Sequence, residues 1–449
     1  MKNVFSRFIA AISVSALAAC SPQTDAVTET GSVRVLAPMS NSKGSYSLDI
    51  FELRGITDLQ TVAGKFVKFF MSPRITNNRL QGSAPQARFI KNSDGDFIPA
   101  NELSQQLVTI YAHTQRLALL DEELGAGGVN HWPRDVGVAV KVRGGLTNNA
   151  FYDGNTDSML LVPYSSEGLP IPINGGILAH EHFHSLFYKL VTSDESAQIH
   201  NRETFLNKAI VEDLSVRHRR LLPISTGEEM SEEQMHIYYH LAIIRGLNEG
   251  LADYWGWMYT GDPDFIAQSL PSEKATRSLK VRDENSVNSL PSVENIKRSL
   301  NIFYSGASDK ARFSDYVTGY AYSLGTQFSR MLKRYTDIYG KARNIEDLQA
   351  RKDIAKLIVK VLPKIKVDFD KLDTSYYSAD QFIKSMFAMN ESYREEECQF
   401  LAAVISSSAA SPEEAVSCEK IGEADFKMVP KIETAPATPV TPVAEGHAQ

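Results

Sequence analysis

Apolar and polar residues alternate in short runs over the first quarter of the chain, a pattern typical of β-strands that bury one face. Such runs occur at 33–36, 46–53 and 65–70, and turns rich in Gly, Asn and Ser separate them. We therefore expect a β-rich layer between residues 32 and 98.

The spacing of apolar residues then changes to that of helices. Leucines and isoleucines from 103 to 120 form one helical stripe, which follows Pro99 and Asn101 and ends at the glycines of 125–128. A buried strand is expected at 136–142, and an edge strand after it. Further helices are predicted at 203–222, 231–245, 293–303, 316–335, 344–361 and 379–389.

The apolar helix expected at 175–190 contains an HExxH motif. Residues four apart lie on one face of a helix, so His180 and His184 could offer two imidazole nitrogens to one tetrahedral zinc ion. Glu181 lies beside them and could take a proton from a water molecule at the metal. A chance match inside an ordinary core helix is the alternative, because the apolar residues of the segment would pack in either case.

The segment 246–257 offers the third protein ligand that a catalytic zinc ion usually has. Glu249 supplies a carboxylate. Asp253, one turn later, could accept the ring N–H of a ligating histidine and fix its orientation. The alternative is a solvated acidic face, but Leu247 and Trp255 favour a buried helix, in which unpaired carboxylates are costly.

Together these segments resemble the gluzincin metallopeptidases, and within them the thermolysin family. The pattern of that family is HExxH followed by Asn-Glu-x-x-x-Asp, and Asn248, Glu249 and Asp253 match its second part. The resemblance implies zinc as the cofactor, a peptide or protein as the substrate, and a place beside the metal ligands for Asn248 as well as Asp253.

A second match lies upstream, at 146–161. This stretch resembles the edge strand with which thermolysin-like enzymes bind extended substrates, and it implies substrate contacts for Asn149 and Ala150. The resemblance covers roughly 101–258. It implies an α+β, two-lobed fold, with a β-rich, zinc-binding region at 32–260 and a helical lobe at 261–426.

The chain departs from the family between the two zinc-binding segments, where the connection is much longer. An insertion is therefore expected at about 194–233, as a lid or a wall of the cleft. In or beside it lie the histidines at positions 200, 218, 236 and 240.

A second departure concerns the donor for the oxyanion that forms during peptide hydrolysis. Thermolysin-like enzymes use a histidine of the helical lobe, but the only histidine after His240 is His447. Tyr316 begins a Tyr-x-x-Gly sequence that resembles the transition-state tyrosine motif of gluzincin aminopeptidases, and we expect it to be the donor. Tyr320 and Tyr322 are alternatives, as is a histidine of the insertion.

Charge and the N-terminal sequence bear on partners and location. The net charge of −7, without a basic block, argues against a nucleic-acid partner. Residues 1–19 have the basic start and short apolar core of a signal peptide. They end at Cys20 in a sequence that resembles a bacterial lipobox, which implies acylation of Cys20 and a lipid anchor in the cell envelope. Ser21 after the cysteine is typical of sorting to the outer membrane.

Two cysteines remain after Cys20, namely Cys398 and Cys418. In an oxidising compartment they could form a disulfide, and two buried thiols are the alternative. A polar tether is expected at 20–31, and the tail at 427–449 is rich in Pro, Thr and Ala, which predicts disorder.

The sequence thus predicts a lipid-anchored zinc endopeptidase with Glu181 as its general base. An aminopeptidase is the nearest alternative, although Asn149 to Asp153 lack the glutamate that would hold a substrate amino group. An inactive, zinc-stabilised surface protein for adhesion or assembly is the alternative of another class.

Overall fold

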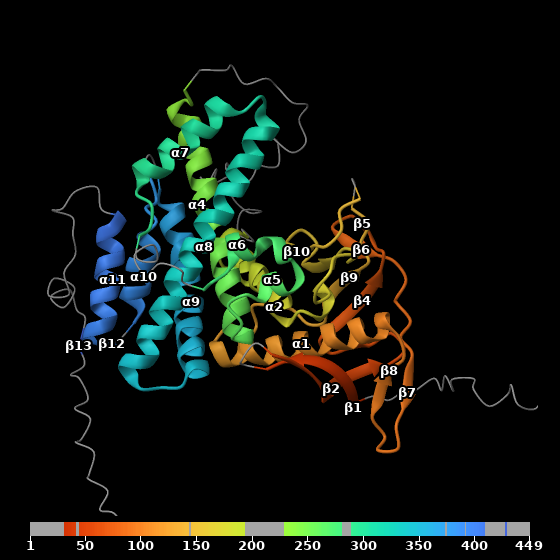
Figure 1. Cartoon of the computed structure of the whole chain (residues 1–449). Helices are drawn as coiled ribbons and strands as arrows, with labels where there is room; N and C mark the ends of the chain where they lie inside the picture. The colour runs from red at the N-terminus through yellow and green to blue at the C-terminus, as the bar shows by residue number, and fades with distance from the viewer. Residues whose placement is uncertain are drawn as a thin grey trace, which may run out of the picture.

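A computed structural model describes the structure of the chain over residues 31–41, 45–142, 145–193, 229–280, 289–372, 375–390, 392–408 and 427–428. Helices and strands are both abundant, as the α+β prediction requires. Figure 1 shows that the two larger sheets and helix α1 (Glu102–Leu124) come from the N-terminal half of the chain, whereas the described C-terminal half is mostly helical.

The first sheet of the described residues has five strands, in the order β3-β2-β1-β8-β7. Its strands are β1 (Gly31–Ser40), β2 (Tyr46–Asp58), β3 (Ala63–Gly64), β7 (Phe89–Lys91) and β8 (Phe97–Pro99). β1 and β2 pair antiparallel, with the buried residues Val33 and Leu53 opposite each other and the exposed Arg34 and Glu52 next to them. The alternation of the sequence thus matches the two faces of the sheet.

The second sheet has four strands, in the order β10-β11-β9-β4. It consists of β4 (Val67–Met71), β9 (Arg134–Val138), β10 (Ala150–Asp153) and β11 (Ser158–Leu161), and a separate hairpin is formed by β5 (Arg74–Thr76) and β6 (Arg79–Gln81). β4, β9 and β11 are parallel, whereas β10 is antiparallel to β11 and lies at the edge. An edge strand keeps one row of backbone groups available for other partners.

Helix α1 (Glu102–Leu124) confirms the predicted apolar stripe, since Leu107, Ile110 and Leu117 are buried. It begins where Asn101 Oδ1 accepts a hydrogen bond from the N–H of Ser104. It ends at Gly125, whose φ of 83° places it in the left-handed region.

The segments 175–190 and 246–257, for which the sequence predicts metal ligands, lie on two helices that pack against each other. The first is α2 (Gly175–Phe187), preceded by the 3-10 helix η1 (Ile171–Ile173) and followed by the π-helix η2 (Tyr188–Thr192). The second is α4 (Glu232–Thr260), a single helix where the sequence suggested two segments, 231–245 and 246–257. A capping box of Ser231 and Gln234 begins it, and Gly261 ends it.

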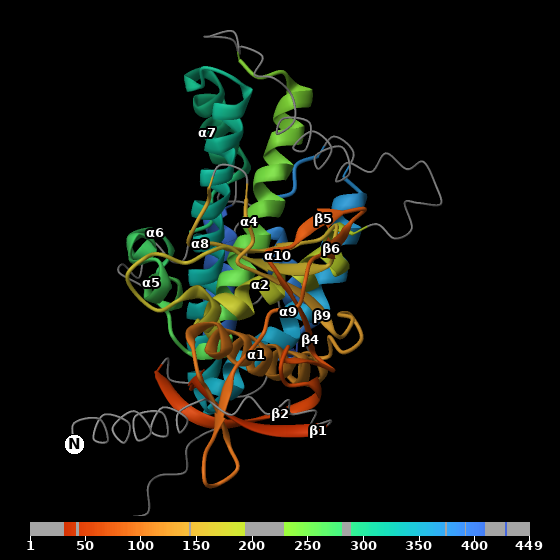
Figure 2. The same cartoon turned by 90° about the vertical axis from the view of Figure 1, so that its right-hand side faces the viewer.

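The remaining elements are mostly helical: α5 (Phe265–Ser269), η3 (Pro271–Glu273), α6 (Lys274–Arg277), α7 (Val293–Gly306), α8 (Lys310–Arg343), α9 (Asp347–Asp370), α10 (Gln381–Met389) and α11 (Glu395–Ser408), with β12 (Ser392–Tyr393) paired to β13 (Lys427–Met428). The helices predicted from 293 to 389 are thus confirmed, although α8 is longer than expected. Figures 1 and 2 show α7 and the adjoining ends of α4 and α8 projecting away from the sheets.

Helix α4 packs closely against α8 at two of its glycines. Glycine lowers helix propensity, and α4 contains Gly246 and Gly250 in its interior. A Cβ atom on Gly325 of α8 would lie 2.9 Å from the backbone O of Gly246 and 2.9 Å from the backbone N of Gly250. The two helix backbones therefore touch at these glycines, directly beside Glu249.

Several predicted segments lie outside the described residues. They are the leader at 1–19, the tether apart from Gly31, the greater part of the insertion (194–228) and all of the tail after Met428. Within the described part of the chain, no helix combines the length and the apolar character that crossing a bilayer requires.

Candidate metal centre

Helix α2 is fixed at its N-terminal end by Asn174, which is completely buried. Its Oδ1 accepts hydrogen bonds from the N–H groups of Gly176 and Ile177, at 3.0 and 3.2 Å. Its Nδ2 donates to the backbone O of Phe265 at 2.7 Å and to Ser269 Oγ at 2.8 Å. The start of α2 is therefore held against α5. This contact helps to position the HExxH motif, which begins at His180 in the same helix.

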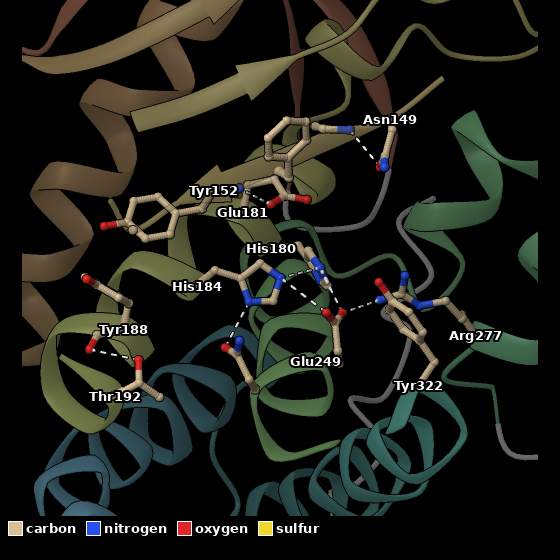
Figure 3. A pocket seen from close by; sticks show the side chains of 14 residues that line it. Asn149, Tyr152, His180, Glu181, His184, Tyr188, Thr192, Glu249, Arg277 and Tyr322 are labelled. Carbon is tan, nitrogen blue, oxygen red and sulfur yellow. Dashed lines mark hydrogen bonds and ion pairs between the residues drawn. The ribbon is translucent and has the colours of Figure 1, made fainter. Parts of the chain in front are cut away.

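Three ligand atoms converge between α2 and α4 (Figure 3). His180 Nε2 and His184 Nε2 are 3.0 Å apart, and the carboxylate oxygens of Glu249 lie 3.6 Å from the first and 3.9 Å from the second. All three ligand atoms lie within 4.8 Å of one another and could hold a metal ion. The predicted convergence is confirmed, while the geometry alone does not distinguish zinc from other metals.

The outer ring nitrogens of both histidines face hydrogen-bond acceptors. His184 Nδ1 lies 2.9 Å from Asn248 Oδ1, and His180 Nδ1 lies 3.0 Å from Asp253 Oδ1 in a bent contact. An oxygen that only accepts favours a proton on each Nδ1, which leaves a lone pair on each Nε2. Two lone pairs and a carboxylate repel one another at these distances unless a cation lies between them, so this set of donors fits a divalent metal.

Glu181 lies beside the ligands but points toward the edge strand. Its Oε2 accepts a hydrogen bond from the backbone N–H of Tyr152 at 3.0 Å. The side chain is buried, and burial raises the pKa of Glu181 to about 7, although the nearby His180 opposes the shift. A carboxylate that exchanges its proton near neutral pH suits general acid–base chemistry.

Arg277, on the short helix α6, is a site residue that the sequence reading missed. Its Nη2 donates to Asp253 Oδ1 at 2.6 Å and to Glu249 Oε2 at 3.4 Å. Its guanidinium lies 4.9 Å from the centroid of the Tyr322 ring. Arg277 thus holds a candidate metal ligand and the carboxylate that orients His180. No motif or periodicity marks it in the sequence.

A cleft of about 310 Å³ opens over these groups, and the edge strand β10 forms one wall. Asn149 and Ala150, the expected substrate contacts, both line it. Asn149 Oδ1 accepts a hydrogen bond from the N–H of Ala150 at 2.9 Å. Tyr188 and Thr192 of η2 line another part of the wall, as Figure 3 shows.

Tyr316 does not reach the cleft, contrary to our expectation. Its hydroxyl accepts a hydrogen bond from Arg312 Nε at 3.4 Å, and its ring packs against Phe303 of α7. Tyr320, one turn along the same face of α8, packs against Phe303 as well. Tyr322 lies on another face of that helix and, unlike Tyr316 and Tyr320, lines the cleft.

The insertion histidines within the described residues also lie elsewhere. His240 is buried, and its Nε2 accepts a hydrogen bond from the backbone N–H of Tyr377 at 3.0 Å. His236 Nε2 lies 3.0 Å from a backbone oxygen of the same loop. Both join α4 to the segment before α10. His200 and His218 fall outside the described residues.

Cys398 is buried and disulfide-bonded. Its predicted partner Cys418 lies outside the described residues, as does Cys20. Comparison with known proteins adds no relative: no family model, no curated protein and no solved structure matches this chain.

Proposed function

We propose that the protein is a zinc metallopeptidase with a two-lobed, thermolysin-like organisation. One observation carries the proposal. Two histidine nitrogens and the carboxylate of Glu249 converge next to a buried carboxyl group, Glu181, and the edge of a β-sheet runs past both. This combination supplies a metal site, a proton acceptor and a surface for an extended peptide.

Each of these residues has a role in the hydrolysis of a peptide bond. A zinc ion held by the three ligands would polarise a water molecule and the carbonyl group of a bound peptide. Glu181 would accept a proton from the attacking water and pass a proton to the departing amine. Arg277 would keep Glu249 in place. Tyr322, which lines the cleft, is the proposed donor of a hydrogen bond to the oxygen on which negative charge develops.

An extended substrate is proposed because β10 is an edge strand within the cleft wall. A peptide that lies along such an edge would form backbone hydrogen bonds of the sheet type, whatever its side chains are. The N–H groups of Ala150 and Tyr152 on β10 are held by Asn149 and Glu181, so the peptide would pair with other backbone groups or displace these contacts. Ala150 and the side chain of Asn149 lie on this wall and are the proposed contacts. The pocket residues beyond the edge strand, such as Tyr188, would then influence which side chains are accepted.

An endopeptidase is favoured over an aminopeptidase by the carboxylates of the cleft. Among the described residues that line it, Glu181 and Glu249 are the acidic ones, and both have roles at the metal. An aminopeptidase would need a further carboxylate for the substrate amino group. The inactive adhesion or assembly protein is the alternative of another class. The presence of Glu181 argues against it, whereas the lack of the histidine that thermolysin-like enzymes use as oxyanion donor argues for it.

We also propose that the protein is anchored in the bacterial cell envelope through acylated Cys20. The support is the lipobox-like sequence around that residue and the signal-peptide pattern before it. A site for extended peptides on such a protein would act on substrates outside the cytoplasm.

Removal of metal tests the proposed function. The purified protein should cleave at least some members of a library of quenched fluorescent peptides. A chelator in excess should abolish the cleavage, and added Zn²⁺ should restore it. An inhibitor of serine peptidases is the control and should leave the rate unchanged. Cleavage that survives chelation would contradict the proposal, and metal binding without any cleavage would favour the inactive alternative.

A further inference from the structure

The turn between β10 and β11 rests on the π-helix η2, which directly follows the metal-binding helix α2. Lys189 Nζ donates a hydrogen bond to Asp157 Oδ2 at 2.7 Å. Tyr188 lies against Gly154, where any Cβ atom would overlap the tyrosine ring. The hairpin that carries the edge strand is therefore attached to the end of the helix that carries His180 and His184.

The same carboxylate also holds the edge strand itself. Asp157 Oδ1 accepts a hydrogen bond from Tyr152 Oη at 2.8 Å. The backbone N–H of Tyr152 donates to Glu181 on α2. The contacts from Lys189 to Asp157, from Asp157 to Tyr152 and from Tyr152 to Glu181 therefore connect η2 to β10 and β10 to α2. Because η2 directly follows α2, the edge strand is attached to this helical segment at two points.

Lys189 is itself held by a buried polar network on the far side of α2. Its Nζ lies 3.3 Å from Asn130 Oδ1, and Asn130 Nδ2 donates to Asp121 Oδ2 at 3.0 Å. Asp121 Oδ1 lies 2.9 Å from Nε2 of His182, the middle histidine of the HExxH segment. Asn130, Asp121 and His182 are all buried. The ammonium group therefore has a fixed position from which to hold Asp157.

We infer that Asp157 and Lys189 form a clamp that positions β10 on α2 and so fixes Glu181 against the edge strand. They are positioning residues, because neither of them lines the cleft. The catalytic consequence rests on the proposed function, whereas the structural consequence does not. The side chain of Asp157 is 37% exposed, so the pair contributes little to global stability and its loss should act locally.

Amide hydrogen exchange tests the structural part. In Lys189→Met, which keeps the aliphatic stem, the amide of Tyr152 should exchange roughly tenfold faster or more, while the core helices keep their protection. Lys333→Met is the matched control. Its ion pair with Asp337 on α8 has the similar N–O distance of 2.9 Å and a lysine side chain that is 18% exposed, against 16% for Lys189. The control should leave the Tyr152 amide unchanged.

Kinetics test the catalytic part. Lys189→Met should lower kcat by roughly 10- to 100-fold, because small displacements of reacting groups have effects of that size. Bound metal and melting temperature should stay at the wild-type values. Lys189→Arg keeps a cation that can bind Asp157 and should recover most of the rate. Asp157→Asn should have an effect similar to Lys189→Met, and the double variant should be little worse than either, as expected for one shared interaction.

The outcomes separate the two claims. An unchanged Tyr152 amide in Lys189→Met would overturn the clamp whether or not the protein is a peptidase. Faster exchange with an unaltered kcat would overturn its catalytic consequence. Faster exchange in a protein that cleaves no peptide would support the clamp and contradict the proposed function instead.

Discussion

A Glu181→Gln variant is expected to lose peptide hydrolysis almost completely while it retains its metal. Glutamine has the size of glutamate and can still accept the N–H of Tyr152, but its amide does not take up a proton from water. Removal of a general base typically lowers kcat by about 10²- to 10⁴-fold, and we expect an effect of at least 10³-fold. The ligand atoms of His180, His184 and Glu249 are untouched by the change.

The test is a steady-state assay combined with metal analysis of the same preparation. Glu167→Gln serves as the control, because Glu167 is exposed and lies outside the cleft lining. An unchanged turnover in Glu181→Gln would mean that another residue is the base. A loss of metal would mean that Glu181 acts as a ligand.

A Tyr322→Phe variant is expected to lower kcat by about 10²- to 10³-fold, the usual effect of removing one donor to a developing oxyanion. The negative charge of Glu249, together with burial, raises the pKa of Tyr322, so its hydroxyl keeps its proton and remains a donor at neutral pH. Phenylalanine preserves the ring that lies beneath Arg277. KM should change little, because the hydrogen bond forms mainly in the transition state.

Tyr316→Phe is the matched control for this experiment, since it removes the same hydroxyl from the same helix. It should leave kcat unchanged, because Tyr316 Oη contacts Arg312 and lies outside the cleft. A normal rate in Tyr322→Phe would exclude Tyr322 as the donor. A larger loss in Tyr316→Phe than in Tyr322→Phe would return the role to the residue that the motif suggested.

The ligand set could be predicted from the sequence because helix geometry fixes it locally. His180 and His184 are four residues apart on one helix, and Glu249 and Asp253 repeat the same spacing on another. The edge strand was predicted from the resemblance of residues 146–161 to the substrate-binding strand of a known family, and β10 does lie at the edge of its sheet. Local spacing leaves open how α2 and α4 meet. The structure brings them close at Gly256 of α4, where a Cβ atom would lie 2.8 Å from the backbone O of Gly176 on α2.

The residues that escaped prediction depend on contacts between distant segments. Arg277 binds Asp253, which lies 24 positions earlier in the chain, and no sequence pattern near Arg277 indicates this contact. Tyr316 was chosen for a short motif, but the face of α8 that turns toward the cleft carries Tyr322. With 18 tyrosines in the chain, a motif of two fixed residues selects poorly among them. The contact between Lys189 and Asp157 could not be predicted either, because it depends on how the β10–β11 hairpin packs against η2.

The metal content of the wild type and of Glu249→Ala, measured side by side by elemental analysis, tests the central claim most directly. Two imidazole nitrogens and one carboxylate oxygen favour zinc, so the wild type should contain about one zinc ion per chain. Glu249→Ala should lose most of it, because two histidines alone form a weak site. A wild type without bound metal under zinc-replete conditions, or full zinc occupancy in Glu249→Ala, would contradict the claim that His180, His184 and Glu249 form a metal centre.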